Sequence, residues 1–114
     1  MIEAQFHCAT CNAVAATLQL TDDNQFIQSG FMGNSCEGGS GRLAILLERA
    51  LRQQNIGTIY KLNGLWAPFY CPTCQATYCS EHWLKEVQFD DDFAGWYDCT
   101  YGTCPAGHRR IVDD

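Results

Sequence analysis

The sequence predicts an α+β fold within one small domain, and three observations support this. Apolar side chains alternate along residues 12–20, as they do in a half-buried strand. Apolar residues recur at helical spacing along residues 42–55. Cysteine and histidine residues stand in short pairs elsewhere, and metals or disulfides held by such residues often stabilise a domain of only 114 residues.

The first predicted element is a strand over residues 12–20 ("NAVAATLQL"), and a returning strand begins at residues 26–27. One face of the first strand carries four apolar residues, which are Val14, Ala16, Leu18 and Leu20. The polar residues 21–24 form the turn between the two strands. Residues 29–41 contain many glycines, so we expect a loop there.

A helix is predicted over residues 42–55, where one face is apolar. That face consists of Leu43, Leu46 or Leu47, Ala50 and Leu51. On the outer face Glu48 can pair with Arg52, four residues later. We expect the helix to end at Asn55 or Gly57, because these residue types commonly terminate helices.

Three further elements are predicted in the second half of the chain. An Asn-Gly pair at residues 63–64 stands between two apolar runs, which is a strong signal for a tight hairpin. Ser80 is the predicted N-cap of a short helix that continues to about Val87. Residues 95–102 ("GWYDCTYG") form a further short strand.

The charge and composition of the chain exclude some classes of partner. The formal net charge is −6, so the surface field repels phosphate backbones, and nucleic acid is an unlikely partner. The start of the sequence has neither a basic segment nor a long apolar run, so no signal peptide is predicted. No apolar run approaches the roughly 20 residues that span a bilayer. We therefore expect a soluble cytoplasmic protein with reduced thiols and no membrane partner.

Eight candidate metal ligands occur as four short pairs, which are Cys8 with Cys11, Cys71 with Cys74, Cys79 with His82, and Cys104 with His108. Zinc prefers four such ligands in a tetrahedron, and they usually arrive in pairs from tight turns. Four pairs in a chain of this length predict two structural zinc ions.

Two groupings of these pairs are compatible with their spacing. The two middle pairs, within residues 71–82, can share one ion, and residues 8–11 then pair with residues 104–108. Alternatively the pairs interleave. In that case one ion binds Cys8, Cys11, Cys79 and His82, and the other binds Cys71, Cys74, Cys104 and His108.

The stretch "CPTCQATYCSEH" at residues 71–82 resembles the middle of cross-brace zinc fingers of the RING and B-box types. The resemblance covers residues 69–112 together with residues 8–11. In these families alternate ligand pairs bind alternate ions, so the resemblance implies the interleaved grouping. Residues 12–68 are then a strand, helix and hairpin insertion that packs against a zinc-stabilised cross-brace.

The resemblance also implies a function. Pro105 follows the first ligand of the last pair, as in many RING fingers, and Arg109 follows the final ligand, where RING-type ubiquitin ligases often carry a basic residue. The chain would then be a protein-interaction module that recruits a ubiquitin-type conjugating enzyme without a covalent intermediate of its own. Arg109 would contact the ubiquitin-like protein.

Two cysteines lie outside the four pairs. Cys99 is close enough to the last pair to replace Cys104 or His108 as a ligand. Cys36 stands in the glycine-rich segment ahead of a helix, where a helix dipole can lower a thiol pKa, so an alternative function is a transfer enzyme with Cys36 as nucleophile. A second alternative is a nucleic-acid-binding zinc ribbon.

Overall fold

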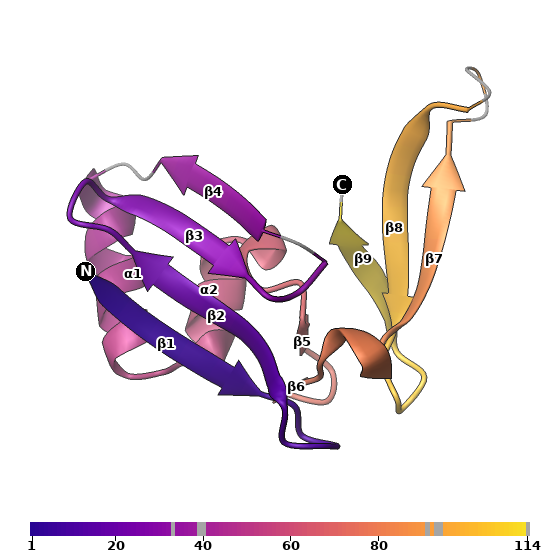
Figure 1. The fold of residues 1–114 in the computed structure, drawn as a ribbon, viewed down its shortest axis with the longest axis horizontal. Coiled ribbons are helices and arrows are strands. Elements are labelled where there is room, and N and C mark those ends of the chain that lie inside the picture. The colour runs from indigo at the N-terminus through magenta and orange to yellow at the C-terminus, as the bar shows by residue number, and fades with distance from the viewer. Residues whose placement is uncertain (33, 39–40, 91, 93–94, 114) are drawn as a thin grey trace.

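The structure is a computed structural model, and it describes residues 1–32, 34–38, 41–90, 92 and 95–113. The strands are β1 (Ile2–His7), β2 (Val14–Leu20), β3 (Gln25–Ser29), β4 (Asn34–Gly38), β5 (Tyr70–Cys71), β6 (Ala76–Thr77), β7 (Leu84–Phe89), β8 (Tyr97–Thr103) and β9 (Arg109–Asp113). The helices are α1 (Gly41–Arg52) and α2 (Ile56–Leu62), with two short 3-10 turns, η1 (Gly64–Trp66) and η2 (Ser80–His82). The predicted α+β class is confirmed (Figure 1).

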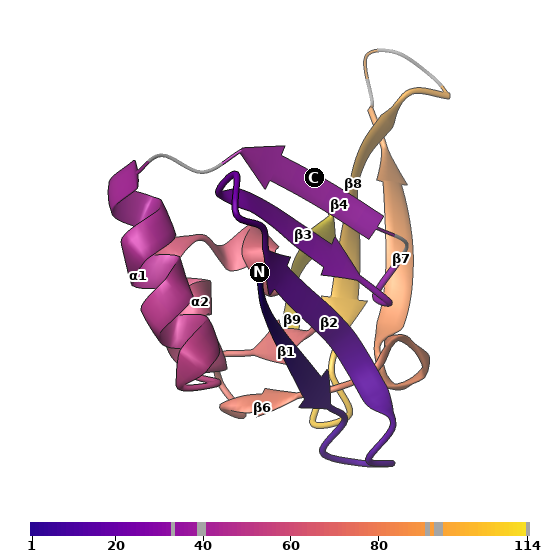
Figure 2. The same ribbon diagram turned by 60° about the vertical axis from the view of Figure 1, so that its left-hand side comes forward.

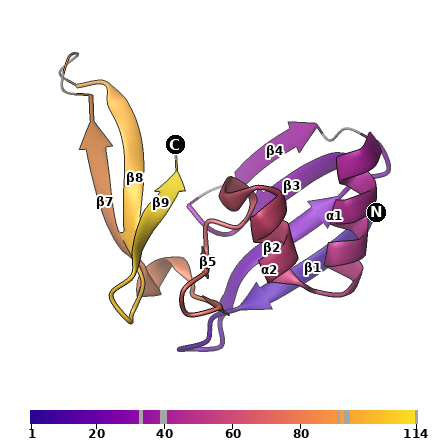
Figure 3. The same ribbon diagram turned by 180° about the vertical axis from the view of Figure 1, so that it is seen from behind.

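Strands β1 to β4 form an antiparallel sheet in the order β1-β2-β3-β4, and both helices cover one of its faces (Figure 3). The covered face presents apolar side chains at alternate positions, and cross-strand pairs such as Ala4 with Leu18 and Leu20 with Phe26 are buried. Leu47 from α1 is also buried in this core. The predicted hairpin of strands at 12–20 and 26–27 is therefore confirmed as β2 and β3.

Two strands of this sheet were not predicted. β1 precedes the first ligand pair, so the sheet extends beyond the predicted insertion of residues 12–68. β4 falls within the segment 29–41 that the glycines marked as a loop, so that prediction is wrong for residues 34–38, while residues 33, 39 and 40 of the segment lie outside the described residues. β4 forms because its backbone pairs with β3 along its whole length, and sheet hydrogen bonds do not depend on side-chain type.

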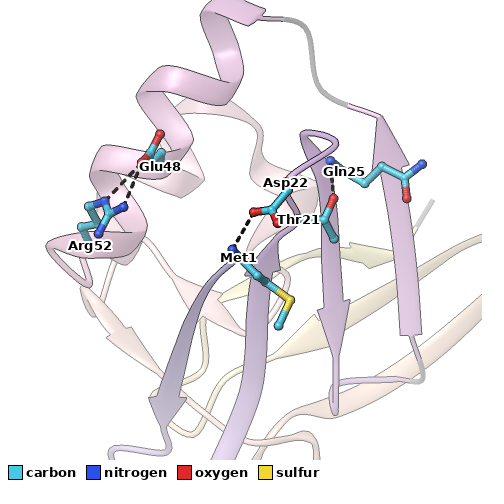
Figure 4. Close-up of polar contacts among 6 residues, drawn as sticks. All are labelled: Met1, Thr21, Asp22, Gln25, Glu48 and Arg52. Atoms are coloured by element: carbon cyan, nitrogen blue, oxygen red, sulfur yellow. Dashed lines mark hydrogen bonds and ion pairs between the residues drawn. The ribbon is translucent and has the colours of Figure 1, made fainter.

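The predicted helix at 42–55 is confirmed as α1, although it ends earlier, at Arg52. Its inner face buries Leu47, Ala50 and Leu51. Arg52 donates to the Glu48 carboxylate at 3.1 Å, as predicted (Figure 4). Neither α1 nor α2, the α-helices of the described part of the chain, is long and apolar enough to cross a membrane.

Polar contacts tie the start of β1 to the β2–β3 turn (Figure 4). The N-terminal ammonium of Met1 lies 2.7 Å from the Asp22 carboxylate and lowers the pKa of that carboxyl through a hydrogen bond and its charge. In the same turn the Gln25 N–H donates to the Thr21 hydroxyl at 3.0 Å. These contacts fix the turn that the polar residues 21–24 predicted.

The hairpin predicted at residues 63–64 is wrong. Residues 56–62 form α2, and the Asn55 side chain caps it by accepting from the Thr58 N–H at 3.2 Å. Asn63 closes the other end with its N–H on the Ile59 carbonyl, and its side chain accepts from the Leu65 N–H at 3.0 Å to begin η1. The asparagine therefore joins two helical segments rather than two strands.

The helix predicted from Ser80 to about Val87 is also wrong. Only η2 is helical, and β7 follows it after Trp83. β7 pairs with the strand predicted at 95–102, which is confirmed as β8, and β9 completes a three-stranded sheet in the order β7-β8-β9. Cross-strand pairing thus overrides the local cap signal.

Trp83 anchors the three-stranded sheet to the rest of the protein. The indole is buried, and its Nε1–H donates to the carbonyls of Tyr78 at 3.1 Å and Phe69 at 3.3 Å. On the sheet side Gly102 leaves room for this ring. A Cβ at Gly102 would lie 2.9 Å from Trp83 Cε3 and 2.8 Å from Val112 Cγ1.

Substituting Gly102 by alanine should therefore destabilise the protein by about 1–3 kcal/mol, because an added methyl group overpacks a filled space. Gly38→Ala is the matched control, since a Cβ there meets no atom within 4 Å. Urea unfolding of both variants measures the difference. Equal stability of the two variants would show that Trp83 and Val112 move aside without penalty.

Candidate metal centres

The pair Cys8 and Cys11 lies in the turn between β1 and β2. The Cys8 N–H donates to the Ala13 carbonyl at 2.7 Å and the Asn12 N–H donates to the Cys8 carbonyl at 2.8 Å, which closes the turn. The Thr10 N–H points at Cys8 Sγ, 3.4 Å away. Asn12 has a φ of 63°, a conformation that asparagine tolerates better than most residues.

The pair Cys71 and Cys74 has a similar local structure in the turn between β5 and β6. The Cys74 N–H points at Cys71 Sγ, 3.4 Å away, and Gln75 has a φ of 53°. In both turns the residue after the second cysteine adopts the left-handed conformation. The chain thereby reverses tightly and directs both sulfur atoms to one side.

The other two pairs are held by different turns. In η2 the His82 N–H donates to the Cys79 carbonyl at 2.9 Å. In the turn between β8 and β9 the Cys104 N–H donates to the His108 carbonyl, also at 2.9 Å, while Gly107 has a φ of +93° that suits glycine. Figures 1 and 3 show the β1–β2, β5–β6 and β8–β9 turns gathered at the same end of the molecule.

The eight predicted ligands form two groups of four. The first cluster contains Cys8, Cys11, Cys79 and His82, and the second cluster contains Cys71, Cys74, Cys104 and His108. Within each cluster all four donor atoms lie within 4.8 Å of one another. Successive ligand pairs along the chain therefore alternate between the two clusters, and the two middle pairs do not share one cluster.

The distances within each cluster suit a tetrahedral metal site. The sulfur atoms of Cys11 and Cys79 are 3.7 Å apart, as are those of Cys74 and Cys104. Each histidine directs Nδ1 into its cluster, 3.0 Å from Cys79 Sγ in the first and 3.2 Å from Cys74 Sγ in the second. A zinc ion with bonds of about 2.3 Å to sulfur would place its sulfur ligands about 3.8 Å apart. The donor set and the sulfur–sulfur spacing therefore fit zinc.

A family model described as Domain of unknown function (DUF8328) matches residues 1–114. The chain belongs to this family. No curated protein and no solved structure matches the chain. No RING or B-box family is identified, so the likeness of the DUF8328 domain to cross-brace fingers rests on its ligand pairs alone.

Hydrogen bonds favour thiolate at two ligands of the DUF8328 domain. Burial raises the pKa of Cys8, but backbone hydrogen bonds, led by that of Cys79, outweigh it and lower the pKa to about 6. Burial also raises the pKa of Cys104, but backbone hydrogen bonds, led by that of His108, outweigh it and lower the pKa to about 7. Thiolate is the form that binds a metal ion.

The net pKa shift has the opposite direction at two other ligands and at a neighbouring tyrosine. Desolvation raises the pKa of Cys71 and of Cys79. A side-chain hydrogen bond with Cys74, together with burial, raises the pKa of Tyr78 to about 12. Tyr78 directly precedes a ligand of the first cluster and contacts a ligand of the second, so it links the two clusters.

The two remaining cysteines lie outside the clusters. Cys99 is buried in β8 opposite Gln88 and is not among the clustered donors. Cys36 is exposed in β4, and its thiol lies 3.8 Å from the Gln25 side-chain oxygen. The predicted loop at Cys36 is therefore wrong, although the residue does precede α1. The role of nucleophile stays a prediction.

Arg109 and Arg110 have different environments in β9. Arg109 is half exposed, stacks 3.8 Å over the Tyr101 ring and lies 3.7 Å from the Glu86 carboxylate. Arg110 instead reaches into the protein and donates to backbone carbonyls, including that of Tyr70 at 2.8 Å. The sequence offered no signal for this role of Arg110 beyond its position after the last ligand.

Proposed function

We propose that this DUF8328 domain is a structural zinc protein in which two zinc ions, one in each cluster, hold a rigid surface for contacts with other proteins. The observation that carries the proposal is the interleaved grouping of the eight donors into two clusters, in each of which all four donor atoms lie within 4.8 Å of one another. The first cluster joins residues 8–11 to residues 79–82, and the second joins residues 71–74 to residues 104–108, so each ion would cross-link segments that are distant in sequence.

Structural rather than catalytic zinc is supported by the ligand count. Catalytic zinc sites usually keep one position for water or substrate, whereas structural sites are filled by four protein ligands. Each cluster supplies three thiols and one imidazole, and six of the eight donors are cysteines, the usual ligands of structural sites. Zinc would neutralise much of the thiolate charge in these buried positions.

A protein partner is favoured over nucleic acid by charge. The chain has a formal net charge of −6, and thiolate ligands add negative charge that two zinc ions only partly offset. Recruitment of a ubiquitin-type conjugating enzyme, with Arg109 as a contact, stays a prediction from the resemblance. The Arg109 side chain is 52% exposed, so it remains accessible to a partner in that scheme.

Native mass spectrometry of protein purified under reducing conditions without added metal tests the zinc proposal. We expect two zinc ions per chain, one fewer after Cys11→Ser or Cys74→Ser, and two after Cys36→Ser, because Cys36 lies outside both clusters. A folded wild-type protein that carries no metal would refute the proposal.

A further inference from the structure

The β7–β8 hairpin forms an arm that extends from the zinc end of the molecule past the rest of the three-stranded sheet (Figures 1 and 2). We define the arm as Leu84–Phe89, Trp96 and Tyr97–Thr103. Its base is fixed by Trp83 and by Lys85, whose ammonium contacts the Ser80 hydroxyl and lies 6.0 Å from the Phe31 ring centre. Farther along the arm, the Tyr97 hydroxyl contacts Thr100 and Asp113 of the same three-stranded sheet.

The outer part of the arm exposes large apolar side chains. Phe89 is 58% exposed, and Trp96 is 70% exposed. Val87 and Tyr97 are about half exposed. Val87 and Phe89 are two residues apart on β7 and therefore share a face, and Tyr97 lies directly opposite Phe89 on β8. The three side chains form one apolar strip, and such strips on a soluble protein usually mark a contact surface.

The strip lies beside an open strand edge. β7 is the first strand in the order β7-β8-β9, and its outer edge pairs with no strand in the described part of the chain. Figures 1 and 3 place this edge on the side away from α1 and α2. Edge strands are commonly protected by lysine, proline or a bulge. The lysine of β7 stands at the base, at Lys85, and the segment 86–89 beyond it has no basic residue or proline. The pairing of β7 with β8 shifts register between Gln88 and Phe89, where the extra residue is Asp98 of β8.

The charge of the hairpin favours a basic partner. Residues 84–103 contain one lysine and five carboxylates, so much of the net negative charge of the chain lies in this segment. Asp92 and Asp98 are exposed. A partner with lysine or arginine beside apolar residues would match both the carboxylates and the strip.

We propose that the outer edge of β7 binds an extended basic segment of another protein, which adds to the sheet as a further strand. Its apolar side chains would lie on Val87, Phe89 and Tyr97, and its basic side chains would face Asp92 and Asp98. This inference rests on the proposed function and specifies the partner class of that surface.

A second copy of the chain fits this edge less well. Three of the seven basic residues lie on α1, and a helix cannot add to a sheet as a strand. The strand that carries basic residues at its start is β9, where Arg110 is bound to backbone carbonyls and Arg109 is stacked on Tyr101.

A display library of random dodecapeptides, selected on the zinc-loaded protein, tests the proposal. The arm variant combines Val87→Lys with Phe89→Lys. The control variant combines Leu43→Lys with Ile45→Lys, which adds the same charge at exposed apolar positions of α1. Native mass spectrometry first establishes that both variants retain two zinc ions, so a failure of the zinc proposal is seen separately from a failure of this one.

We expect the recovered peptides to be basic and apolar. Measured by fluorescence anisotropy, they should bind the arm variant at least about tenfold more weakly than wild type, and the control variant with nearly wild-type affinity. Binding should also weaken at high salt. Recovery of no peptides, of peptides without basic residues, or of peptides that bind both variants alike would overturn the proposal. Self-association of the wild type that the arm variant loses would also overturn it, since a second copy would then occupy the edge.

Discussion

Replacing Cys71 by serine should remove one zinc ion and lower the free energy of unfolding by more than about 4 kcal/mol. A serine hydroxyl is a poor zinc ligand, and the free energy of zinc binding to a structural site contributes directly to folding, with apparent values of about 10–16 kcal/mol in small zinc fingers. Cys71 is also buried, so the new hydroxyl would lose its contact with water. Urea unfolding at a fixed free zinc concentration measures the effect.

Cys36→Ser is the control for this substitution, because Cys36 is an exposed cysteine outside both clusters. Its free energy of unfolding should change by less than about 0.5 kcal/mol. Equal losses for Cys71→Ser and Cys36→Ser would contradict a structural zinc ion in the second cluster.

The two clusters should also differ in which part of the protein they stabilise. The second cluster joins the β5–β6 turn to the β8–β9 turn, so Cys71→Ser should increase amide hydrogen exchange mainly in β8 and β9. The first cluster joins the β1–β2 turn to η2, and Cys11→Ser should act mainly on β1 and β2. Hydrogen exchange followed by mass spectrometry distinguishes these patterns.

The sequence predicted those parts of the protein whose structure follows from the types and spacing of neighbouring residues. Cysteine and histidine in pairs predicted the ligand turns, and strict apolar periodicity predicted β2 and α1. Both signals are local and chemically specific. The grouping of pairs required the resemblance to cross-brace fingers, because spacing by itself allowed two arrangements.

The elements that the sequence did not predict depend on contacts between distant residues. β7 is exposed at most of its positions, so it carries no alternating apolar signal and is defined by its pairing with β8. The segment before Asn63 contains β-branched residues that suit a strand, yet burial of Ile59 and the packing of Tyr60 on Tyr70 favour α2. Tertiary packing decides such segments when local preference is weak.

Arg110 joins β9 to the segment that leads into the second cluster. Its guanidinium donates to the carbonyls of Gly64 at 2.8 Å, Ala67 at 3.0 Å and Tyr70 at 2.8 Å. It also lies 5.2 Å from the Tyr60 ring centre. Burial lowers the pKa of Arg110, but an arginine stays charged in a folded protein. The charged guanidinium of Arg110 thus provides hydrogen-bond donors for these three backbone carbonyls.

Arg110→Met should therefore lower the free energy of unfolding by about 3–5 kcal/mol, because the three carbonyls lose charged donors and stay partly buried. Arg110→Lys should recover less than half of this loss, since a lysine ammonium cannot reproduce the planar fork of a guanidinium. Urea unfolding of zinc-loaded protein measures both, and native mass spectrometry should find two zinc ions in each variant.

The neighbouring Arg109→Met is the matched control. Arg109 is half exposed, and its contacts with Tyr101 and Glu86 should contribute about 1 kcal/mol or less. The two substitutions remove the same charge from adjacent positions of one strand, so net charge cannot explain a difference between them. A similar loss of stability in both variants would mean that the carbonyls around Arg110 find other donors, and that the second cluster alone holds β9 in place.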